Sequence, residues 1–568
     1  MKATQINPFN HDLPAADTPL VNVHFNGRWI KVPKGTNVVE VTRTAGDFLP
    51  HYCYHPKLSV SGNCRMCLFE MGMPKAGPDR QPILGEDGLP AEIMWMPRPV
   101  IGCATQVTEG MGIRTDSPMA QECRKGVMEF LLINHPLDCP ICDQAGECKL
   151  QEFSSDYGTG ESRFVEQKVK KPKNVDLGER IVLDDERCIL CSRCVRFAKE
   201  VMNDDVLGFV NRGSHNSLTA HPGKRFDNPY SLNTVDICPV GALTSKDFRF
   251  KMRVWFLKET PSVCTSCGRG CNIEIGSRQD QIYRLTPRTN EEVNSHWMCD
   301  YGRLNFHALQ SPERLLQPEA RVGSNLFPSD WSAIQGQISR QLSEKGGSRT
   351  AFLISASCTN EELYLIKSWA EELGVAHLEV VPRQGEADGF LRVADVHSNT
   401  NGARLIGVGR DGAGLPDLVA AVRSGKIEAL VCWQEDAIAA GLNEDDLKKL
   451  KLLVSASVLP NVTTNHAHFV LPVSGFAEKR GSLINVDGRL QRLNRAVSAP
   501  GQARDDWEVI QAIRHACGGG NSLHLIEDVF RQMTEKVPVL SGLTLGKIGD
   551  QGLALELQTA QIPQAASI

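Results

Sequence analysis

Hydrophobic and polar positions alternate with a period of two near the N-terminus, where VNVHFNGRWIKVP (residues 21–33) surrounds Asn26-Gly27. This pattern predicts a β-hairpin, because an Asn-Gly pair readily adopts the left-handed backbone of a two-residue turn. The next segment, NVVEVTRTAG (residues 37–46), predicts a short helix that ends at Gly46. A hairpin, a helix and a following cysteine loop favour a small β-grasp domain.

The second half of the chain follows another pattern, in which apolar strand-like runs alternate with amphipathic helices. TNEELYLIKSWAEELG (residues 359–374) predicts a helix with a capping box from Thr359 to Glu362 and a terminal Gly374. This alternation predicts a parallel, doubly wound sheet with helices on both faces. Its other segments are RTAFLISAS (349–357), HLEVV (377–381), RLIGVG (404–409), LPDLVAAVRSG (415–425), IEALVCW (427–433) and LKLLVSAS (450–457).

Three regions outside these two patterns carry weaker signals. Residues 116–150 are predicted to be largely helical, since MAQECRKGVMEFLLIN (119–134) has apolar residues at helical spacing. NIEIGSR (272–278) and IYRLTP (282–287) are strand-like. Residues 1–19 are predicted to be a loose polar lead-in, and the C-terminal tail is rich in alanine and glutamine.

Length and charge limit the classes of protein that fit this chain. With 568 residues it is too long for one hydrophobic core, and three to five domains are expected. A net charge of −5 argues against a nucleic-acid-binding protein, and the basic run at residues 168–173 is predicted to be a solvated linker. We expect no transmembrane segment and no secretory signal, because the sequence has neither a long apolar run nor an apolar N-terminal region.

The cysteines are concentrated in one half of the chain. Sixteen of the 19 lie between Cys53 and Cys299, and the others are Cys358, Cys432 and Cys517. In a reducing compartment, such a concentration indicates metal or redox chemistry rather than a disulfide framework.

Three groups of four cysteines have the spacing of cluster ligands. CILCSRC, with a remote Cys-Pro, has the pattern of a ferredoxin [4Fe–4S] site, although Ala198 stands where bacterial ferredoxins place the Cys-Pro ligand. The first group fits a [2Fe–2S] site, because it has a separated first cysteine, a C-x2-C pair and a distant fourth cysteine. Its loop offers backbone N–H groups at Gly62 and Asn63. The first group is Cys53, Cys64, Cys67 and Cys103; the third is Cys188, Cys191, Cys194 and Cys238; the fourth, also predicted as [4Fe–4S], is Cys264, Cys267, Cys271 and Cys299.

The second group, in INHPLDCPICDQAGECKL (residues 133–150), is one ligand short of four. Its cysteines are Cys139, Cys142 and Cys148. The candidates for the fourth ligand of this [4Fe–4S] site are His135, Cys123, Asp138 and Asp143. We favour His135, because the following proline stops the helix at the start of the same loop and lets the imidazole turn inward. A neutral imidazole in place of a thiolate would change the reduction potential of the cluster and could couple it to pH.

Structural zinc is the alternative for these groups, most plausibly for the fourth taken alone. It suits the third group poorly, because three cysteines at two-residue spacing plus Cys-Pro are typical of ferredoxins. Several sulfur-rich sites in one chain favour an electron-conducting series, which zinc cannot provide.

The segments HPLDCPICDQAGEC, ERCILCSRCVRFAKE and DICPVGALTSKDFRF resemble the large iron–sulfur subunit of respiratory complex I. This family comprises the G subunit of bacterial NADH–quinone oxidoreductase and the mitochondrial 75-kDa subunit. The resemblance extends through TNEELYLIKSWAEELG to GSLINVDGRLQRL and therefore covers most of the chain. Parts of these motifs also occur in NAD-linked formate dehydrogenases and in hydrogenases.

The resemblance implies an α+β iron–sulfur half followed by a shortened α/β molybdopterin-oxidoreductase-like domain. It assigns His135 and its three cysteines to one cube. It implies that the fourth cluster occurs only in some bacterial members and lies off the main electron path. The expected domains are a lead-in (1–19), a [2Fe–2S] β-grasp domain (20–115), a His/Cys3 domain (116–180), a ferredoxin-like [4Fe–4S] domain (181–258), an additional [4Fe–4S] domain (259–310) and the α/β domain (311–568).

The implied function is electron relay within NADH–quinone oxidoreductase. Electrons would enter from a partner subunit that binds NADH and FMN, and leave to a two-cluster ferredoxin-like subunit on the way to quinone. Other peripheral-arm subunits are also expected as partners. The chain would lie on the cytoplasmic face of the inner membrane and reach the membrane only through the complex. The alternative is the iron–sulfur subunit of a soluble formate dehydrogenase or hydrogenase.

The C-terminal domain is expected to hold no molybdopterin, because only about 260 residues follow Leu304 and a working enzyme of that class is much longer. Cys358 lies in a βα loop, a place where ligands often bind, but its surroundings do not resemble a formate dehydrogenase active site. GVGRDG (407–412) has the form G-x-G-x-x-G. Asp411 would repel a phosphate there, and Glu435 is the nearest candidate for a ribose-binding acid, so we expect no dinucleotide site.

Overall fold

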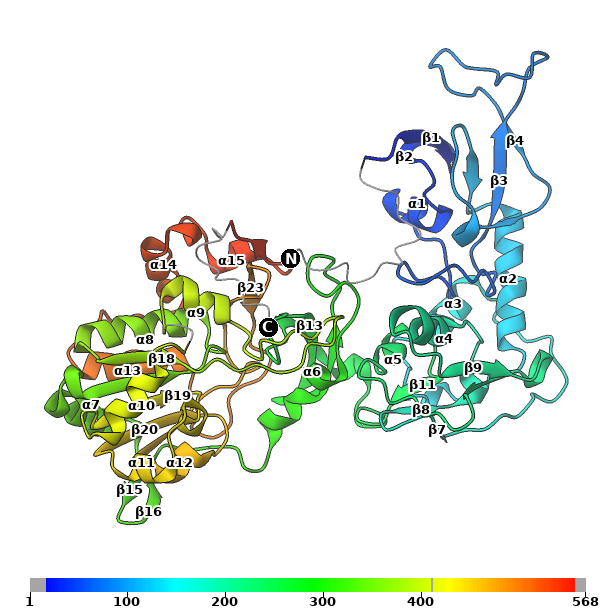
Figure 1. Cartoon of the computed structure of the whole chain (residues 1–568). Coiled ribbons are helices and arrows are strands. Elements are labelled where there is room, and N and C mark those ends of the chain that lie inside the picture. The colour runs from blue at the N-terminus through cyan, green and yellow to red at the C-terminus, as the bar shows by residue number, and fades with distance from the viewer. Residues whose placement is uncertain (1–16, 410–411, 557–568) are drawn as a thin grey trace. The chain divides into compact units, whose positions relative to one another are not determined.

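The computed structural model describes residues 17–409 and 412–556 (Figure 1). The lead-in up to residue 16, Asp411 and most of the C-terminal tail therefore lie outside the described residues. The chain forms two compact units, one ending at Phe256 and the other beginning at Leu257. The finer domain boundaries expected from the sequence stay predictions.

The N-terminal unit begins with the expected hairpin and helix. Strands β1 (Leu20–Phe25) and β2 (Arg28–Pro33) pair antiparallel, and the turn residues Asn26 and Gly27 have φ of 42° and 89°. Helix α1 (Val38–Thr44) is capped by Asn37. Its valines pack with Val23 and Ile113 in one core. The sheet order is β2-β1-β6-β3-β4, with β5 beside β3; the added strands are β3 (Leu68–Pro74), β4 (Ile93–Trp95), β5 (Val100–Ile101) and β6 (Gly112–Arg114).

Two helices follow, and they correct the prediction for residues 116–150. Helix α2 (Pro118–Leu132) is separated from α3 (Lys149–Tyr157) by a loop with one short 3-10 turn, η2 (Cys139–Ile141). The helix stops before His135-Pro136, as expected, but residues 133–148 contain less helix than predicted, because Pro136 and Pro140 cannot donate backbone hydrogen bonds and Pro136 disfavours helical backbone at His135. The cysteines of the second group are thus carried by a loop.

The rest of this unit is built from short elements around cysteine loops. One sheet has the order β11-β8-β7, and β9 pairs with β10. These strands are β7 (Val175–Asp176), β8 (Ile181–Leu183), β9 (Leu207–Val210), β10 (Ser217–Ala220) and β11 (Leu243–Ser245). The helical elements are η3 (Asp185–Arg187), α4 (Arg193–Arg196), the π-helix η4 (Phe197–Val201), η5 (Gly213–His215), α5 (Asn233–Ile237) and η6 (Val254–Phe256), with η1 (Gly102–Ala104) in the β-grasp portion.

The second unit starts with a three-stranded antiparallel meander, β12-β13-β14. Strands β13 (Asn272–Arg278) and β14 (Gln281–Pro287) confirm the strand predictions for these segments. Strand β12 is Lys258–Val263, and α6 (Asp300–Leu304) and η7 (Asn305–Gln310) follow.

A seven-stranded sheet forms the centre of this unit, in the order β16-β15-β21-β20-β19-β17-β18. Strands β17 to β21 are parallel, and β15 and β16 form an antiparallel edge. The five parallel strands have the order 2-1-3-4-5 of a flavodoxin-like, doubly wound sheet. The strands are β15 (Glu319–Val322), β16 (Asn325–Pro328), β17 (Thr350–Ile354), β18 (His377–Val380), β19 (Ala429–Trp433), β20 (Leu452–Ser457) and β21 (Phe469–Pro472).

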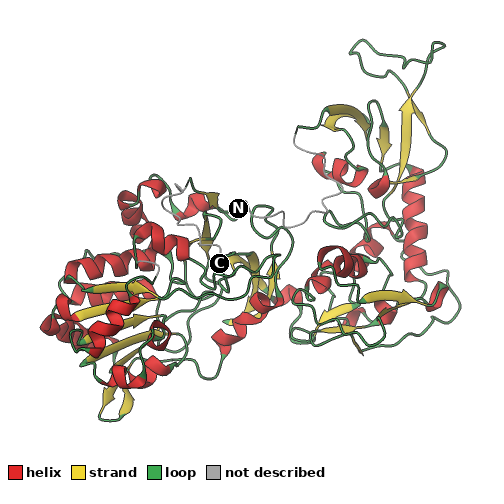
Figure 2. Cartoon of the chain, in the orientation of Figure 1, coloured by secondary structure: helices red, strands yellow, loops and turns green. Residues whose placement is uncertain are grey.

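Helices cover both faces of this sheet, as predicted (Figure 2). Phe352 and Ile354 pack on the face covered by α7 (Trp331–Lys345), α8 (Asn360–Leu373), α13 (Asp506–Ala516) and α14 (Ile526–Lys536). Ala351 and Leu353 face α10 (Leu415–Arg423) and α11 (Glu444–Lys448). The remaining elements are η8 (Gly347–Arg349), η9 (Ala437–Ala440), α12 (Val462–His466), β22 (Gly481–Ile484), β23 (Arg489–Leu493), η10 (Pro538–Leu540), α15 (Leu545–Ile548) and β24 (Leu553–Ala554).

Helix α8 matches its prediction at both ends, whereas RLIGVG does not form a strand. Thr359 and Glu362 form the capping box, and Gly374 ends α8 with φ 67°. The RLI of RLIGVG lies in helix α9 (Thr400–Ile406), which ends at Gly407 with φ 80°. A short apolar run does not distinguish strand from helix, and here Ala403 and Ile406 pack at helical spacing. The glycine motif therefore follows a helix, not the strand that a dinucleotide site requires.

Candidate metal centres

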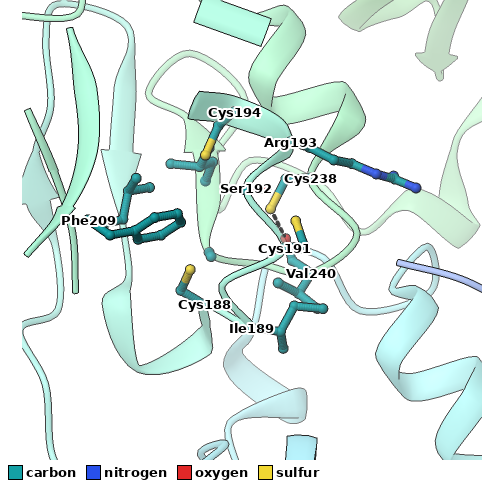
Figure 3. Close-up of a pocket in the computed structure, with 12 residues that line it drawn as sticks. Cys188, Ile189, Cys191, Ser192, Arg193, Cys194, Phe209, Cys238 and Val240 are labelled. Carbon is teal, nitrogen blue, oxygen red and sulfur yellow. Dashed lines mark hydrogen bonds between the residues drawn. The ribbon is translucent and has the colours of Figure 1, made fainter. Parts of the chain in front are cut away.

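The four cysteines of the third group line one cavity (Figure 3). Cys188 follows η3, Cys191 lies in the next loop, Cys194 belongs to α4, and Cys238 ends α5. Leu190 and Ser192, on either side of Cys191, have φ of 55° and 61°. Left-handed backbone at a leucine costs about 1–3 kcal/mol and is most common at functional sites. The loop therefore holds a costly conformation that brings these thiols together.

The walls of this cavity suit a buried, sulfur-bound group. Its other lining side chains are largely apolar, including Phe209 and Leu218. The Leu190 N–H donates to Cys188 Sγ at 3.4 Å, and the N–H groups of Val240 and Leu243 lower the pKa of Cys238 against the larger effect of burial. Burial nevertheless raises the pKa of all four thiols, to about 12 for Cys238. Four thiolates would therefore need bound cations, and iron ions of a cluster would supply that charge.

The first group converges as four buried thiols on the β-grasp portion. The Cys53 N–H lies 3.5 Å from Cys64 Sγ, and hydrogen bonds from the Cys103 and Cys64 thiols lower the pKa of Cys53 to about 2. The Cys103 thiol likewise lowers the pKa of Cys67. The Asn63 N–H also stabilises the Cys53 thiolate, in line with the prediction for this loop. Thiols that stabilise neighbouring thiolates form a donor set that suits iron.

The second group lies between α2 and α3, with Cys142 and Cys148 buried and Cys139 exposed. Two of the alternative ligands are engaged elsewhere, since Asp138 pairs with Lys173 and Arg187 and Asp143 accepts from the Phe250 N–H at 2.9 Å. A third, Cys123, lies nine residues before the end of α2, about 13 Å along the helix axis.

His135 is the candidate that fits the second group best. Its Nδ1 is buried and has no hydrogen-bond partner among the described residues. Burial, with Arg187 and Lys168 nearby, lowers the pKa of His135 to about 4. The imidazole is therefore neutral near pH 7, which is the form that binds metal. An orphaned, neutral imidazole at the start of the cysteine loop is what a fourth ligand requires.

The fourth group lies in the second unit, and all four of its thiols are buried. The Cys264 N–H donates to the Cys271 carbonyl at 2.8 Å. Cys299 caps α6 and accepts from the Gly302 N–H at 3.3 Å. A Cβ at Gly302 would lie 2.9 Å from Cys264 Sγ, so glycine is needed for α6 to approach the thiols. Burial raises the pKa of Cys299 to about 11.

The loop CPVGALT connects the second and third groups within the N-terminal unit. Its Cys238 belongs to the third group, while a Cβ at Gly241 would lie 2.3 Å from Cys142 Sγ of the second. The Pro239 carbonyl also accepts from the Lys149 N–H at 3.0 Å, next to Cys148. Gly241 was not among the functional residues predicted from the sequence, although a glycine shortly after Cys-Pro was the available signal. This close approach needs a residue without a side chain.

Side chains of the second unit fill the crevice beyond β17 and β19, where the strand order reverses. Lys479 Nζ lies 2.8 Å from Glu362 and 3.2 Å from Asp506, and all three residues are buried. Cys358 lies near this triad, and burial together with Glu362 raises the pKa of its thiol. Arg383 pairs with Glu435. The place where open α/β sheets bind ligands is thus occupied by internal ion pairs.

The stability of the second unit is expected to fall as pH rises through the Glu362 transition. Burial raises the pKa of Glu362 from 4.5 to about 7 despite the opposing charge of Lys479. The folded state therefore holds an extra proton between these pH values, and its stabilising effect is lost as pH rises through about 7. Hydrogen exchange of the β17 amides from pH 5 to 8 would measure how the free energy of unfolding changes with pH. In Glu362→Gln, the part of this pH dependence that comes from residue 362 should be absent. An equal slope in both proteins would contradict the assignment.

Among residues 17–409 and 412–556, no three His, Cys, Asp or Glu side chains are arranged to hold a single metal ion. A cluster spreads its ligands over several iron atoms, so this finding does not bear on clusters. No helix in the same ranges combines the length and apolar character needed to cross a membrane.

Family models match the chain in consecutive segments. A 2Fe-2S iron-sulfur cluster binding domain matches residues 18–118, and an NADH-ubiquinone oxidoreductase-G iron-sulfur binding region matches 124–163. The ferredoxin-like domain of NADH-quinone oxidoreductase subunit 3 matches 178–244, an NDSU1/NuoG-like 4Fe-4S domain 257–307, and molybdopterin oxidoreductase 396–516. The G subunit of NADH-quinone oxidoreductase from Rickettsia felis is 38% identical over 355 residues, which cover 62% of this chain and 49% of that protein.

The chain is similar to the G subunits of NADH–quinone oxidoreductase. Subunit 3 of this oxidoreductase from Thermus thermophilus is 38% identical over 63% of the chain and 47% of its own length. The 78 kDa subunit of the Neurospora crassa mitochondrial enzyme is 28% identical over 92% of the chain and 84% of its own length. The matched region spans about half the length of the Rickettsia and Thermus relatives.

These matches confirm the predicted fold class, in which [2Fe–2S] and [4Fe–4S] ferredoxin-like domains precede a molybdopterin-oxidoreductase domain. A solved NAD+-reducing [NiFe]-hydrogenase chain is 26% identical, with a TM-score of 0.34 over 41% of this chain and 91% of that one.

Proposed function

We propose that the chain is an electron-transfer subunit of NADH–quinone oxidoreductase. The observation that carries this proposal is the contact between successive cysteine groups in the N-terminal unit. The third group shares the CPVGALT loop with the second, and Asn63 beside Cys64 donates to the Leu190 carbonyl of the third-group loop at 2.9 Å. Redox centres must lie close together in a low-dielectric interior to exchange electrons, and these contacts support the order first, third, second.

The proposed ligands are the sixteen residues of the four groups. An iron–sulfur cluster, when bound, stores and releases single electrons. The protein holds the clusters, excludes water from them and supplies N–H groups to their sulfur ligands. The [2Fe–2S] ligands would be Cys53, Cys64, Cys67 and Cys103, and the [4Fe–4S] ligands His135, Cys139, Cys142 and Cys148; Cys188, Cys191, Cys194 and Cys238; and Cys264, Cys267, Cys271 and Cys299.

The α/β domain is proposed to act as a scaffold without molybdopterin. The internal ion pairs beyond β17 and β19 support this, because a cofactor would have to displace Lys479 from two buried carboxylates. Chemistry on NADH is assigned to a flavin-binding partner subunit. The proposed acceptor is a two-cluster ferredoxin-like subunit, within a peripheral arm on the cytoplasmic face of the inner membrane.

Metal and sulfide analysis combined with EPR tests this function. One [2Fe–2S] and three [4Fe–4S] clusters amount to about 14 iron atoms per chain, and stepwise reduction should reveal separate signals. Four zinc ions with little iron would contradict the relay. Molybdenum or tungsten, or formate oxidation by the isolated chain, would instead favour the catalytic alternative.

Replacing His135 with cysteine should alter one cluster and leave the others unchanged. A thiolate adds a negative charge that a neutral imidazole lacks, so the His135→Cys variant should have a lower midpoint potential for one [4Fe–4S] cluster. Potentiometric EPR titration measures this shift. His221→Cys is a matched control, because His221 lies at the end of the β9–β10 hairpin outside the cysteine groups. Identical spectra and midpoints for every cluster in His135→Cys would exclude His135 as a ligand.

A further inference from the structure

The guanidinium group of Arg196 donates hydrogen bonds to the loops of both the first and the third cysteine groups. Arg196 Nη2 donates to the Cys53 carbonyl at 2.5 Å and to the Cys191 carbonyl at 3.3 Å. Its Nη1 donates to the Ser59 carbonyl, and its Nε donates to Ser192 Oγ at 3.1 Å. Arg196 therefore contacts the main chain of one proposed ligand residue from each of two clusters.

A second arginine spans the same two loops. Arg193 Nη1 donates to the Ile237 carbonyl at 3.0 Å, and its Nη2 donates to the Tyr54 carbonyl. Ile237 directly precedes Cys238, and Tyr54 directly follows Cys53. Both arginines thus hold residues that are ligands or neighbours of ligands. Five donors in a rigid plane suit arginine to this bridging, whereas a lysine would keep the positive charge with fewer of the hydrogen bonds.

The charges of these arginines are not neutralised by protein carboxylates. Neither side chain forms an ion pair within the described part of the chain, and all their bonds go to carbonyl or hydroxyl oxygens. The nearest acid in this network, Glu200, instead accepts from the Ser59 N–H at 2.8 Å. Both arginines are partly buried. A partly buried positive charge acts strongly on nearby charges, because little water screens it.

We propose that Arg196 is a positioning residue that fixes the [2Fe–2S] loop against the neighbouring [4Fe–4S] loop and raises the reduction potential of both clusters. The proposal rests on the ligand assignment above. Reduction adds one negative charge to a cluster, so a fixed cation nearby stabilises the reduced form. One residue would then hold two centres of the relay close together and make both of them easier to reduce.

The test compares three variants of the full-length, cluster-containing chain by iron analysis and EPR-monitored redox titration. Arg196→Gln removes the charge, Arg196→Lys keeps it, and Arg212→Gln removes an exposed arginine elsewhere in this unit. At a fixed potential, Arg196→Gln should lower the reduced-to-oxidised ratio of both clusters about tenfold, about 59 mV for a one-electron couple. Arg196→Lys and Arg212→Gln should stay within about threefold of the original ratios.

Each outcome decides for or against the role of Arg196. Unchanged midpoints in Arg196→Gln, a shift in only one cluster, or an equally large shift in Arg196→Lys would overturn it. If Arg196→Gln loses iron, the Arg196→Lys variant decides. The proposal is supported if Arg196→Lys retains its iron and the original midpoint potentials of both clusters, and it is overturned if Arg196→Lys loses both clusters. Absence of the [2Fe–2S] and [4Fe–4S] signals from the unaltered chain would instead contradict the proposed function.

Discussion

Replacing Cys191 with alanine is expected to remove a whole [4Fe–4S] cluster, about four iron and four sulfide per chain. Cys191 lines the third-group cavity, and its carbonyl accepts from Arg196. Alanine offers no sulfur to bind iron, and the described residues that line the cavity offer no further thiol. Because the proposed order of electron transfer passes from the first group through this cavity to the second, electron transfer from the [2Fe–2S] site onward should fall to near zero.

Iron analysis, sulfide analysis and EPR of the Cys191→Ala protein measure this loss. Cys123→Ser is the matched control, since Cys123 is a partly buried cysteine of the same unit that the proposed ligand set leaves out. It should retain all clusters. Full iron content in Cys191→Ala would refute the assignment of this group. Loss of about four iron atoms from Cys123→Ser would make Cys123, not His135, the fourth ligand of the second group.

Replacing Lys479 with methionine is expected to destabilise the second unit by about 3–5 kcal/mol at pH 8. The variant leaves the carboxylates of Glu362 and Asp506 buried without their cation. Removing one partner of a buried ion pair costs more than the pair itself contributes, because the remaining charge stays desolvated. Trp433 Nε1 still donates to Asp506 at 2.8 Å, which offsets only part of that cost.

Hydrogen exchange of the central β19 amides measures this free energy, because those amides exchange only when the unit opens. Lys448→Met is the matched control, since its partner Asp445 is exposed and the pair contributes at most about 1 kcal/mol. Adding Glu362→Gln and Asp506→Asn to Lys479→Met should restore much of the stability. A loss below about 1 kcal/mol in Lys479→Met would show that the triad is not desolvated as described.

Signals confined to a few consecutive residues predicted local structure correctly. Asn26-Gly27 specified its hairpin turn, and the Thr359 capping box specified the start of α8. Both are decided by hydrogen bonds between near neighbours in the chain. The strand prediction for RLIGVG was wrong because near neighbours do not decide this segment. Its apolar run fits strand or helix equally well, and only packing against distant residues selects the helix.

The sequence by itself determined which iron–sulfur chemistry is predicted for this protein, because candidate cluster ligands are recognised by residue type and spacing. The cysteine triplets, the remote Cys-Pro and the vacancy beside His135 are all present in the linear chain. Only the tertiary structure decided which groups adjoin one another. Arg196 and the Cys53 carbonyl are 143 residues apart in sequence and 2.5 Å apart in space. No local pattern encodes such a contact, since it forms only when the two loops have folded against each other.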